Sequence, residues 1–184
     1  IHSIESMALV DGPGVRSVVF LQGCRLRCQY CHNPDTWSMT GKNIQEMSAE
    51  TLVKRLSRFK PYYGDKGGVT FSGGECMLQL DFLEEVLRRL KEKGIHTAVD
   101  TAGNVPYKDF ERILPYTDLF LYDMKAFHEQ VHRELTGVSN VRIKDNLLRL
   151  SRTGTDIRIR IPVIEELNAA ELPFMKDFLW ENGI

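Results

Sequence analysis

The chain has 184 residues, of which 42% are hydrophobic and 27% charged, and its formal net charge is −1. This length suits one compact domain, which we expect to span residues 1–184. A balanced charge gives no field that would attract nucleic acid or an anionic membrane surface. No apolar run approaches the ~20 residues that cross a bilayer, and no signal-peptide pattern is present. The composition therefore predicts a cytoplasmic protein without nucleic-acid or membrane partners.

Short apolar runs alternate with amphipathic stretches along most of the chain. The predicted strands cover residues 15–21, 68–72, 95–100, 118–123 and 156–163. The predicted helices cover residues 48–59, 81–93, 107–114, 128–135, 143–151 and 169–181. Strands separated by helices form right-handed βαβ units with parallel strands. The predicted fold class is therefore α/β, a partial (β/α)6-type barrel of parallel strands with flanking helices.

The ends of one helix and of the chain allow finer predictions. Asp81 is expected to be an N-cap with Glu84 in the capping-box position, and Gly94 a C′ glycine. The chain begins at Ile1 rather than Met and stops just after the last predicted helix. We therefore expect a piece of a longer protein, truncated at the C-terminus, with the last strand of the barrel missing. The strand at 156–163 would then have an unpaired edge.

Three of the four cysteines lie close together after the first predicted strand, as Cys24, Cys28 and Cys31 in the spacing C-x3-C-x2-C. This crowding is unlike a disulfide framework and indicates metal or redox chemistry. Three thiolates can hold three corners of a 4Fe–4S cube and leave the fourth iron open. A zinc site with His32 as a fourth ligand and buried thiols without metal are the alternatives. Because a fourth thiolate would close the open iron, Cys76 is expected to be a buried small hydrophobe.

The second predicted strand ends in Gly73-Gly74-Glu75. Glycines at a strand end let the backbone approach a ligand closely, although a Gly-Gly pair alone is more typical of a simple tight turn. Together with the cysteine triplet, this motif resembles the radical S-adenosylmethionine (SAM) superfamily, in which Tyr30 would be the aromatic residue of C-x3-C-x-aromatic-C. Residues 10–16, 20–24, 31–37 and 69–75 further resemble the glycyl-radical-enzyme activating enzymes. No cysteine stands between Cys31 and Cys76, so the cysteine-rich insert of many such activases is absent.

The resemblance implies roles for individual residues. Cys24, Cys28 and Cys31 would hold the 4Fe–4S cluster, and a monovalent cation would be held by Asp100, Thr101 and Asp123. The implied SAM site consists of Tyr30, Cys31, His32, Gly73, Gly74, Asp123, Met124, Lys125 and Arg160. Taken alone, the aspartates could cap turns, Lys125 could be a solvated charge, and Arg160 could lie on the wet face of a strand. Their recurrence at strand ends, where parallel α/β folds bind ligands, favours the functional interpretation.

The resemblance also implies an activity. SAM would be cleaved reductively to a 5′-deoxyadenosyl radical, which abstracts a hydrogen from a glycine of pyruvate formate-lyase. Flavodoxin or ferredoxin would donate the electron, and the full-length protein is expected to be monomeric. Because the cofactors carry the chemistry, no acid–base residue is predicted. An activase of another glycyl radical enzyme, such as anaerobic ribonucleotide reductase, and a non-enzymatic zinc-binding module remain alternatives.

Overall fold

A computed structural model describes residues 1–41 and 44–184 of the chain. Its six strands form one sheet in the order of the sequence, β1-β2-β3-β4-β5-β6. The strands are β1 (Ser3–Ala8), β2 (Arg16–Leu21), β3 (Gly68–Gly73), β4 (His96–Thr101), β5 (Leu119–Asp123) and β6 (Asp156–Arg160). Strands β2 to β6 are parallel, and β1 is antiparallel to β2. Among the described residues β1 and β6 do not pair, so the sheet is open, and the predicted α/β class is confirmed.

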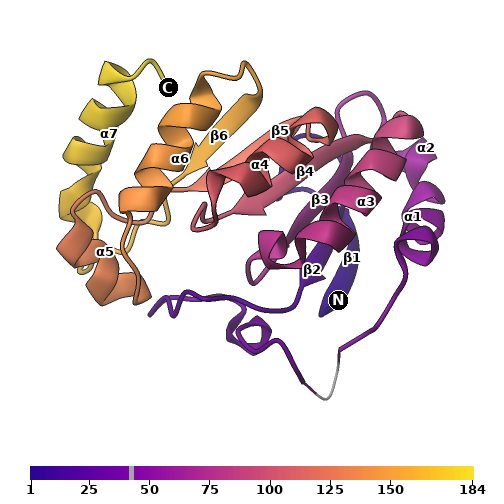
Figure 1. Cartoon of the computed structure of the whole chain (residues 1–184), viewed down its shortest axis with the longest axis horizontal. Helices are drawn as coiled ribbons and strands as arrows, with labels where there is room; N and C mark the ends of the chain where they lie inside the picture. The colour runs from indigo at the N-terminus through magenta and orange to yellow at the C-terminus, as the bar shows by residue number, and fades with distance from the viewer. Residues whose placement is uncertain (42–43) are drawn as a thin grey trace.

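Helices follow most of the strands (Figure 1). They are α1 (Ala49–Ser57), α2 (Lys60–Tyr63), α3 (Leu80–Glu92), α4 (Tyr107–Ile113), α5 (Glu129–Thr136), α6 (Val141–Ser151) and α7 (Leu172–Glu181). Short 3-10 turns cover Pro34–Thr36, Cys76–Gln79, Leu114–Tyr116 and Ala169–Glu171. Within the part of the chain that is described, none of the helices has the length and apolarity needed to cross a membrane.

The two faces of the sheet have different surroundings. Parallel strands in sequential order, joined by right-handed crossovers, place their helices on the same face. On β3, Val69 and Phe71 point to that face and are fully buried in the main hydrophobic core with side chains of α1, α3, α4 and α6. Thr70 and Ser72 alternate with them and point to the opposite face. The face without helices is therefore left for polar side chains and a binding site.

The carboxyl ends of the parallel strands meet at one edge of the sheet. The loop after β2 contains the three clustered cysteines and runs along this edge to α5 (Figure 1). Gly73, Thr101, Asp123 and Arg160 end β3, β4, β5 and β6 at the same edge. The order of strands thus brings together residues that are more than a hundred positions apart in the sequence.

Strand β1 was not predicted, because its sequence lacks a clear apolar alternation. Glu5 and Ser6 in its middle are exposed. The strand is held instead by backbone pairing to β2, with Ser3 opposite Phe20 and Ile4 opposite Val19. Such an edge strand needs little apolar surface of its own, and its charged side chain is typical of strands at a sheet edge.

The predicted start of α3 was wrong and its predicted end was right. A 3-10 turn already precedes Leu80, so Asp81 lies inside the first turn, where its carboxylate pairs with Arg112 at 2.7 Å. At the other end, Gly94 has φ +62° and donates its N–H to the Lys91 carbonyl, while the Ile95 N–H reaches the Leu90 carbonyl. This pair of bonds is the Schellman arrangement that a C′ glycine permits.

Candidate active site

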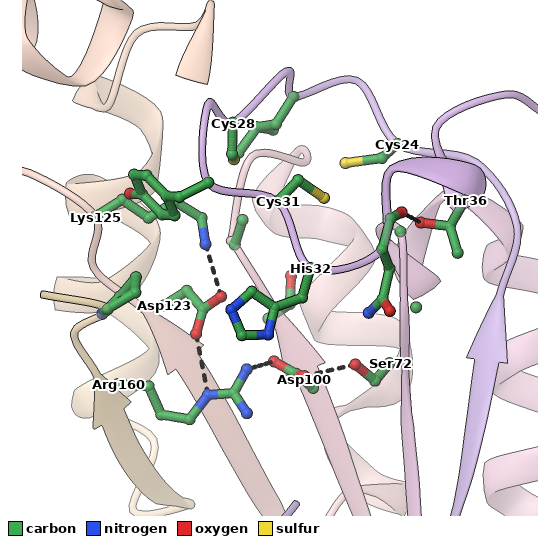
Figure 2. A pocket seen from close by; sticks show the side chains of 18 of the residues that line it. Cys24, Cys28, Cys31, His32, Thr36, Ser72, Asp100, Asp123, Lys125 and Arg160 are labelled. Atoms are coloured by element: carbon green, nitrogen blue, oxygen red, sulfur yellow. Dashed lines mark hydrogen bonds and ion pairs between the residues drawn. The ribbon is translucent and has the colours of Figure 1, made fainter. Parts of the chain in front are cut away.

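A cavity of about 460 Å³ lies at the carboxyl edge of the sheet. Its volume is within the range of small-molecule sites in proteins. The predicted site residues in its lining are Cys24, Cys28, Tyr30, Cys31, His32, Gly73, Gly74, Asp100, Thr101, Asp123, Lys125 and Arg160. The cavity therefore brings together every predicted site residue except Met124 (Figure 2).

The cysteine loop is fixed at its start by backbone hydrogen bonds. The Gly23 N–H donates to the Thr36 carbonyl at 2.7 Å, and the Cys24 N–H donates to the Trp37 carbonyl at 3.1 Å. The side chains of Cys24 and Cys31 point toward one another beside the cavity (Figure 2). All three clustered cysteines are free and partly exposed, so a group in the cavity could reach them.

The three thiols do not form a preorganised zinc site in the part of the chain that the structure describes. Burial raises the pKa of Cys24 to about 11 and also raises the pKa of Cys28, so both are neutral until a metal displaces the proton. A zinc ion needs its ligands within about 2.0–2.3 Å of one point. Among the described residues, no three Cys, His, Asp or Glu side chains converge in that way. The His32 ring is turned away from the thiols into the cavity (Figure 2).

The two glycines after β3 are required by the neighbouring backbone. Gly73 has φ +112°, and a Cβ on it would lie 2.3 Å from the Leu21 carbonyl oxygen. A Cβ on Gly74 would lie 2.2 Å from the Gly23 carbonyl oxygen. The structure gives these glycines a role that needs no ligand, since they let the end of β3 pass close to the end of β2 and to the start of the cysteine loop. A side chain at Gly74 would displace that loop, and one at Gly73 would displace the end of β2.

Glu75 has a structural role that sequence reasoning missed. Its buried carboxylate accepts hydrogen bonds from the Thr101 hydroxyl at 2.8 Å and the Ala102 N–H at 3.0 Å. Burial raises the pKa of Glu75 to about 7 despite these bonds. The carboxylate therefore ties the end of β3 to the end of β4. The position of Glu75 in the Gly-Gly-Glu motif indicated that this residue matters. The motif alone does not show which residues donate hydrogen bonds to its carboxylate.

A network of ion pairs crosses the ends of β4, β5 and β6 (Figure 2). The Arg160 guanidinium contacts Asp100 and donates to Asp123 at 3.0 Å. Asp123 also accepts from Lys125 Nζ at 2.8 Å, and Asp100 accepts from the Ser72 hydroxyl at 2.6 Å. Burial and the charge of Asp123 raise the pKa of Asp100, while Arg160 opposes that rise. Burial alone would lower the pKa of Lys125, but Asp123 raises it above its usual value. These side chains offer both signs of charge to a zwitterionic ligand.

The residues predicted for a cation already have other partners. Arg160 bridges Asp100 and Asp123, and the Thr101 hydroxyl donates to Glu75 instead of facing them. A cation between the two aspartates would have to replace the guanidinium. Arg160 itself is an ion-pairing residue here and not a solvated charge on the wet face of a strand.

Met124 and Cys76 lie outside the cavity lining. The Met124 side chain is buried with Ala126, Leu135 and Met175, and its N–H donates to the Arg160 carbonyl at 2.9 Å. Its predicted contact with SAM therefore has no support from its side chain. Cys76 is fully buried, with its Sγ 3.4 Å from the Asp100 carbonyl oxygen, as expected for a small core residue.

Comparisons with known proteins agree with this geometry. The Radical SAM superfamily matches residues 18–179. A pyruvate formate-lyase-activating enzyme from Clostridium pasteurianum is 52% identical over 168 residues, which cover 91% of this chain and 69% of the relative. The enzyme of the same name from Streptococcus mutans is 43% identical over 182 residues, 96% of this chain and 69% of the relative.

Solved structures show the same fold. A domain of pyruvate-formate lyase-activating enzyme from Bacteroides vulgatus has a TM-score of 0.58 at 34% identity and covers 61% of this chain and 71% of that domain. SuiB from Streptococcus suis, at 20% identity and a TM-score of 0.72, covers 91% of this chain and 37% of SuiB, and it shows the fold alone. The chain belongs to the radical SAM superfamily of enzymes. This membership implies SAM and a 4Fe–4S cluster as the cofactors.

Proposed function

We propose that this chain activates pyruvate formate-lyase by installing a radical on a glycine of that protein. The observation that carries the proposal is the placement of three free thiols beside one cavity that also contains the Asp100, Asp123, Lys125 and Arg160 charges. The names of two relatives at 52% and 43% identity support pyruvate formate-lyase as the substrate. The proposal includes flavodoxin or ferredoxin as the electron donor and a location in the cytoplasm.

When bound, the cluster and SAM supply the electron transfer and the 5′-deoxyadenosyl radical that abstracts the glycine hydrogen. The chain's own residues bind and orient these groups. Cys24, Cys28 and Cys31 would hold three irons and leave one for SAM. The backbone at Gly73 and Gly74 would contact the methionine part of SAM.

The charges at the strand ends would hold the polar groups of SAM. Lys125 and Arg160 can meet its carboxylate, whereas Asp100 and Asp123 can meet positive charge, either on SAM or on a monovalent cation. Tyr30 contributes a buried hydroxyl that has no partner among the described residues. The residue also contributes to the lining of the cavity, where the rest of its side chain can contact the ligand.

Anaerobic reconstitution with iron and sulfide tests the class of the site. We expect about four irons and four sulfides per chain. With dithionite and SAM, the loaded protein should then release 5′-deoxyadenosine and methionine. The matched control is the Cys28→Ala variant, which should do neither. Stoichiometric zinc with no bound iron would contradict the proposal and support a zinc-binding module.

A further inference from the structure

Segment 124–128 leaves the sheet after β5 and carries Lys125 into the cavity. Beyond Met124 it pairs with no strand among the described residues. Three buried side chains from other elements satisfy its backbone, and Lys144 Nζ adds a bond to the Phe127 carbonyl at 3.1 Å. Asn168 Nδ2 donates to the Lys125 carbonyl at 2.8 Å. Asn140 Nδ2 donates to the carbonyls of Ala126 at 2.9 Å and Phe127 at 2.8 Å. The third side chain is that of Glu171, just before α7.

Glu171 caps the start of α5 from another part of the chain. Its Oε2 accepts the N–H groups of Phe127 at 2.9 Å and His128 at 2.7 Å, and its Oε1 lies 2.9 Å from His128 Nδ1. His128 is the N-cap residue of α5 and makes no side-chain capping bond of its own. Burial alone would raise the pKa of Glu171, but the hydrogen bonds from His128 and Phe127 lower it. The carboxylate is thus charged at the helix end that favours negative charge.

The other end of α5 holds the cysteine loop. The Arg27 N–H donates to the Thr136 carbonyl at 2.8 Å, and the Gln29 N–H donates to the Leu135 carbonyl at 2.9 Å. The Gln29 side chain adds a bond to the Glu134 carbonyl at 2.9 Å. These carbonyls belong to the last turn of the helix, where no partner exists within the helix itself. Arg27 and Gln29 flank Cys28, so α5 directly determines where that thiol lies.

We propose that Glu171 is a positioning residue for the cluster loop and acts through α5. A helix of eight residues is not stable alone in water, so its tertiary contacts decide its position. Leu135 packs with Met124 and Met175, and hydrogen bonds hold the two ends of the helix. Glu171 fixes the first end together with segment 124–128, and the second end fixes the cysteine loop. Together with Asn140 and Asn168, this carboxylate therefore helps to place Cys28 relative to Lys125. This inference rests on the proposed function only in assigning a cluster to those thiols.

Amide hydrogen exchange of the metal-free 184-residue chain tests the proposal without any cofactor. In Glu171→Ala, the amides of Arg27 and Gln29 should exchange about tenfold faster than in the parent chain, the usual scale for a lost helix cap. Glu171→Gln keeps a carbonyl oxygen that can accept both backbone N–H groups, so it should restore most of the protection. Glu181→Ala is the matched control, because Glu181 is an exposed glutamate at the far end of α7, the helix that Glu171 precedes. It should leave these rates unchanged.

A second measurement uses the reconstituted protein and a chelator. The chelator should remove the cluster fastest from Glu171→Ala. The rates of cluster loss from Glu171→Gln, Glu181→Ala and the parent chain should be similar to one another. If Glu171→Ala does not fold, Glu171→Asp, which is one methylene shorter, replaces it in both measurements.

The inference is overturned if only the amides of residues 127 and 128 exchange faster, because Glu171 would then cap α5 without holding the loop. It is equally overturned if the exchange rates of amides in β3 and β4 rise as much as those of Arg27 and Gln29. That result would indicate a general loss of stability. If the parent chain takes up no cluster, the proposed function fails, but the exchange rates still decide the role of Glu171.

Discussion

The four cysteines fall into two surroundings that predict opposite results on substitution. Cys24, Cys28 and Cys31 are partly exposed at the cavity, whereas Cys76 is fully buried among core side chains. Each of Cys24→Ala, Cys28→Ala and Cys31→Ala should abolish the absorbance and iron content of the reconstituted cluster. Cys76→Ala should retain about four irons, because three thiolates and SAM complete the cube. Loss of the cluster in Cys76→Ala would contradict the idea of an open iron.

Arg160 is predicted to stabilise the fold before any ligand binds. Its guanidinium neutralises Asp100 and Asp123, which are largely buried. Arg160→Gln should lower the free energy of unfolding by about 1–2 kcal/mol, less than for a fully buried pair because the arginine is partly exposed. Urea unfolding at neutral pH measures this change. Arg158→Gln, on the same strand and exposed, is the control, and equal midpoints for the two variants would contradict the prediction.

At the scale of residues, the spacing of motifs in the sequence was enough to locate residues of the site. It was not enough to identify the residues with which they form hydrogen bonds. The cysteine triplet and the Gly-Gly-Glu motif are local patterns, and both lie at the cavity. The contacts of Glu75 with Thr101 and of Arg160 with Asp100 join different strands, and only the register of the sheet decides them. For the same reason, the sequence could not show that the Met124 side chain points away from the cavity.

At the scale of elements, apolar periodicity located the strands and helices that are buried on one face. The stripe of α3 was predicted to be Phe82, Leu83, Val86, Leu87 and Leu90; the last four are fully buried, whereas Phe82 is only partly buried. Periodicity failed where burial is weak, as in the exposed edge strand β1, and where a 3-10 turn moved the start of α3. Backbone hydrogen bonds hold such segments, and side-chain patterns do not report them.

Helix α5 contains a buried histidine that predicts a dependence of stability on pH. His132 Nδ1 lies 2.8 Å from the Val138 carbonyl, which can only accept, so Nδ1 carries the hydrogen. Burial lowers the pKa of His132 below its ordinary value of 6.5, and Lys125 and Lys144 lower it further. Below pH 6.5 the unfolded chain therefore binds a proton that the folded chain does not, and stability falls as the pH falls.

The His132→Gln variant lacks the imidazole that titrates but keeps an amide N–H that can donate to the Val138 carbonyl. Its urea midpoint, relative to the parent chain, should therefore rise when the pH is lowered from about 7.5 to about 5.5. The raised pKa values of Glu75 and Asp100 act in the opposite direction, since they favour the folded state at lower pH. They are present in both proteins and cancel in the comparison. Parallel pH profiles for the two proteins would show that His132 does not titrate in this way.

At the scale of the whole molecule, the order of the strands explains why a site exists. Helices pack on one face of the sheet. The other face carries a small apolar cluster of Ala98, Leu119 and Leu121 and polar residues that lead to the cavity. The alternation of strands and helices in the sequence was sufficient to predict a parallel sheet that does not close, but not the antiparallel strand β1 at its edge. The extent of the domain and its truncation at the C-terminus stay predictions.

The most direct test of the account is the electron paramagnetic resonance spectrum of pyruvate formate-lyase after anaerobic incubation with the reconstituted chain, reduced flavodoxin and SAM. The Cys28→Ala variant serves as the control and should give no signal. The account predicts a glycyl radical on pyruvate formate-lyase that appears only with the parent chain. Cleavage of SAM without that radical, together with a glycyl radical on anaerobic ribonucleotide reductase in the parallel incubation, would contradict it.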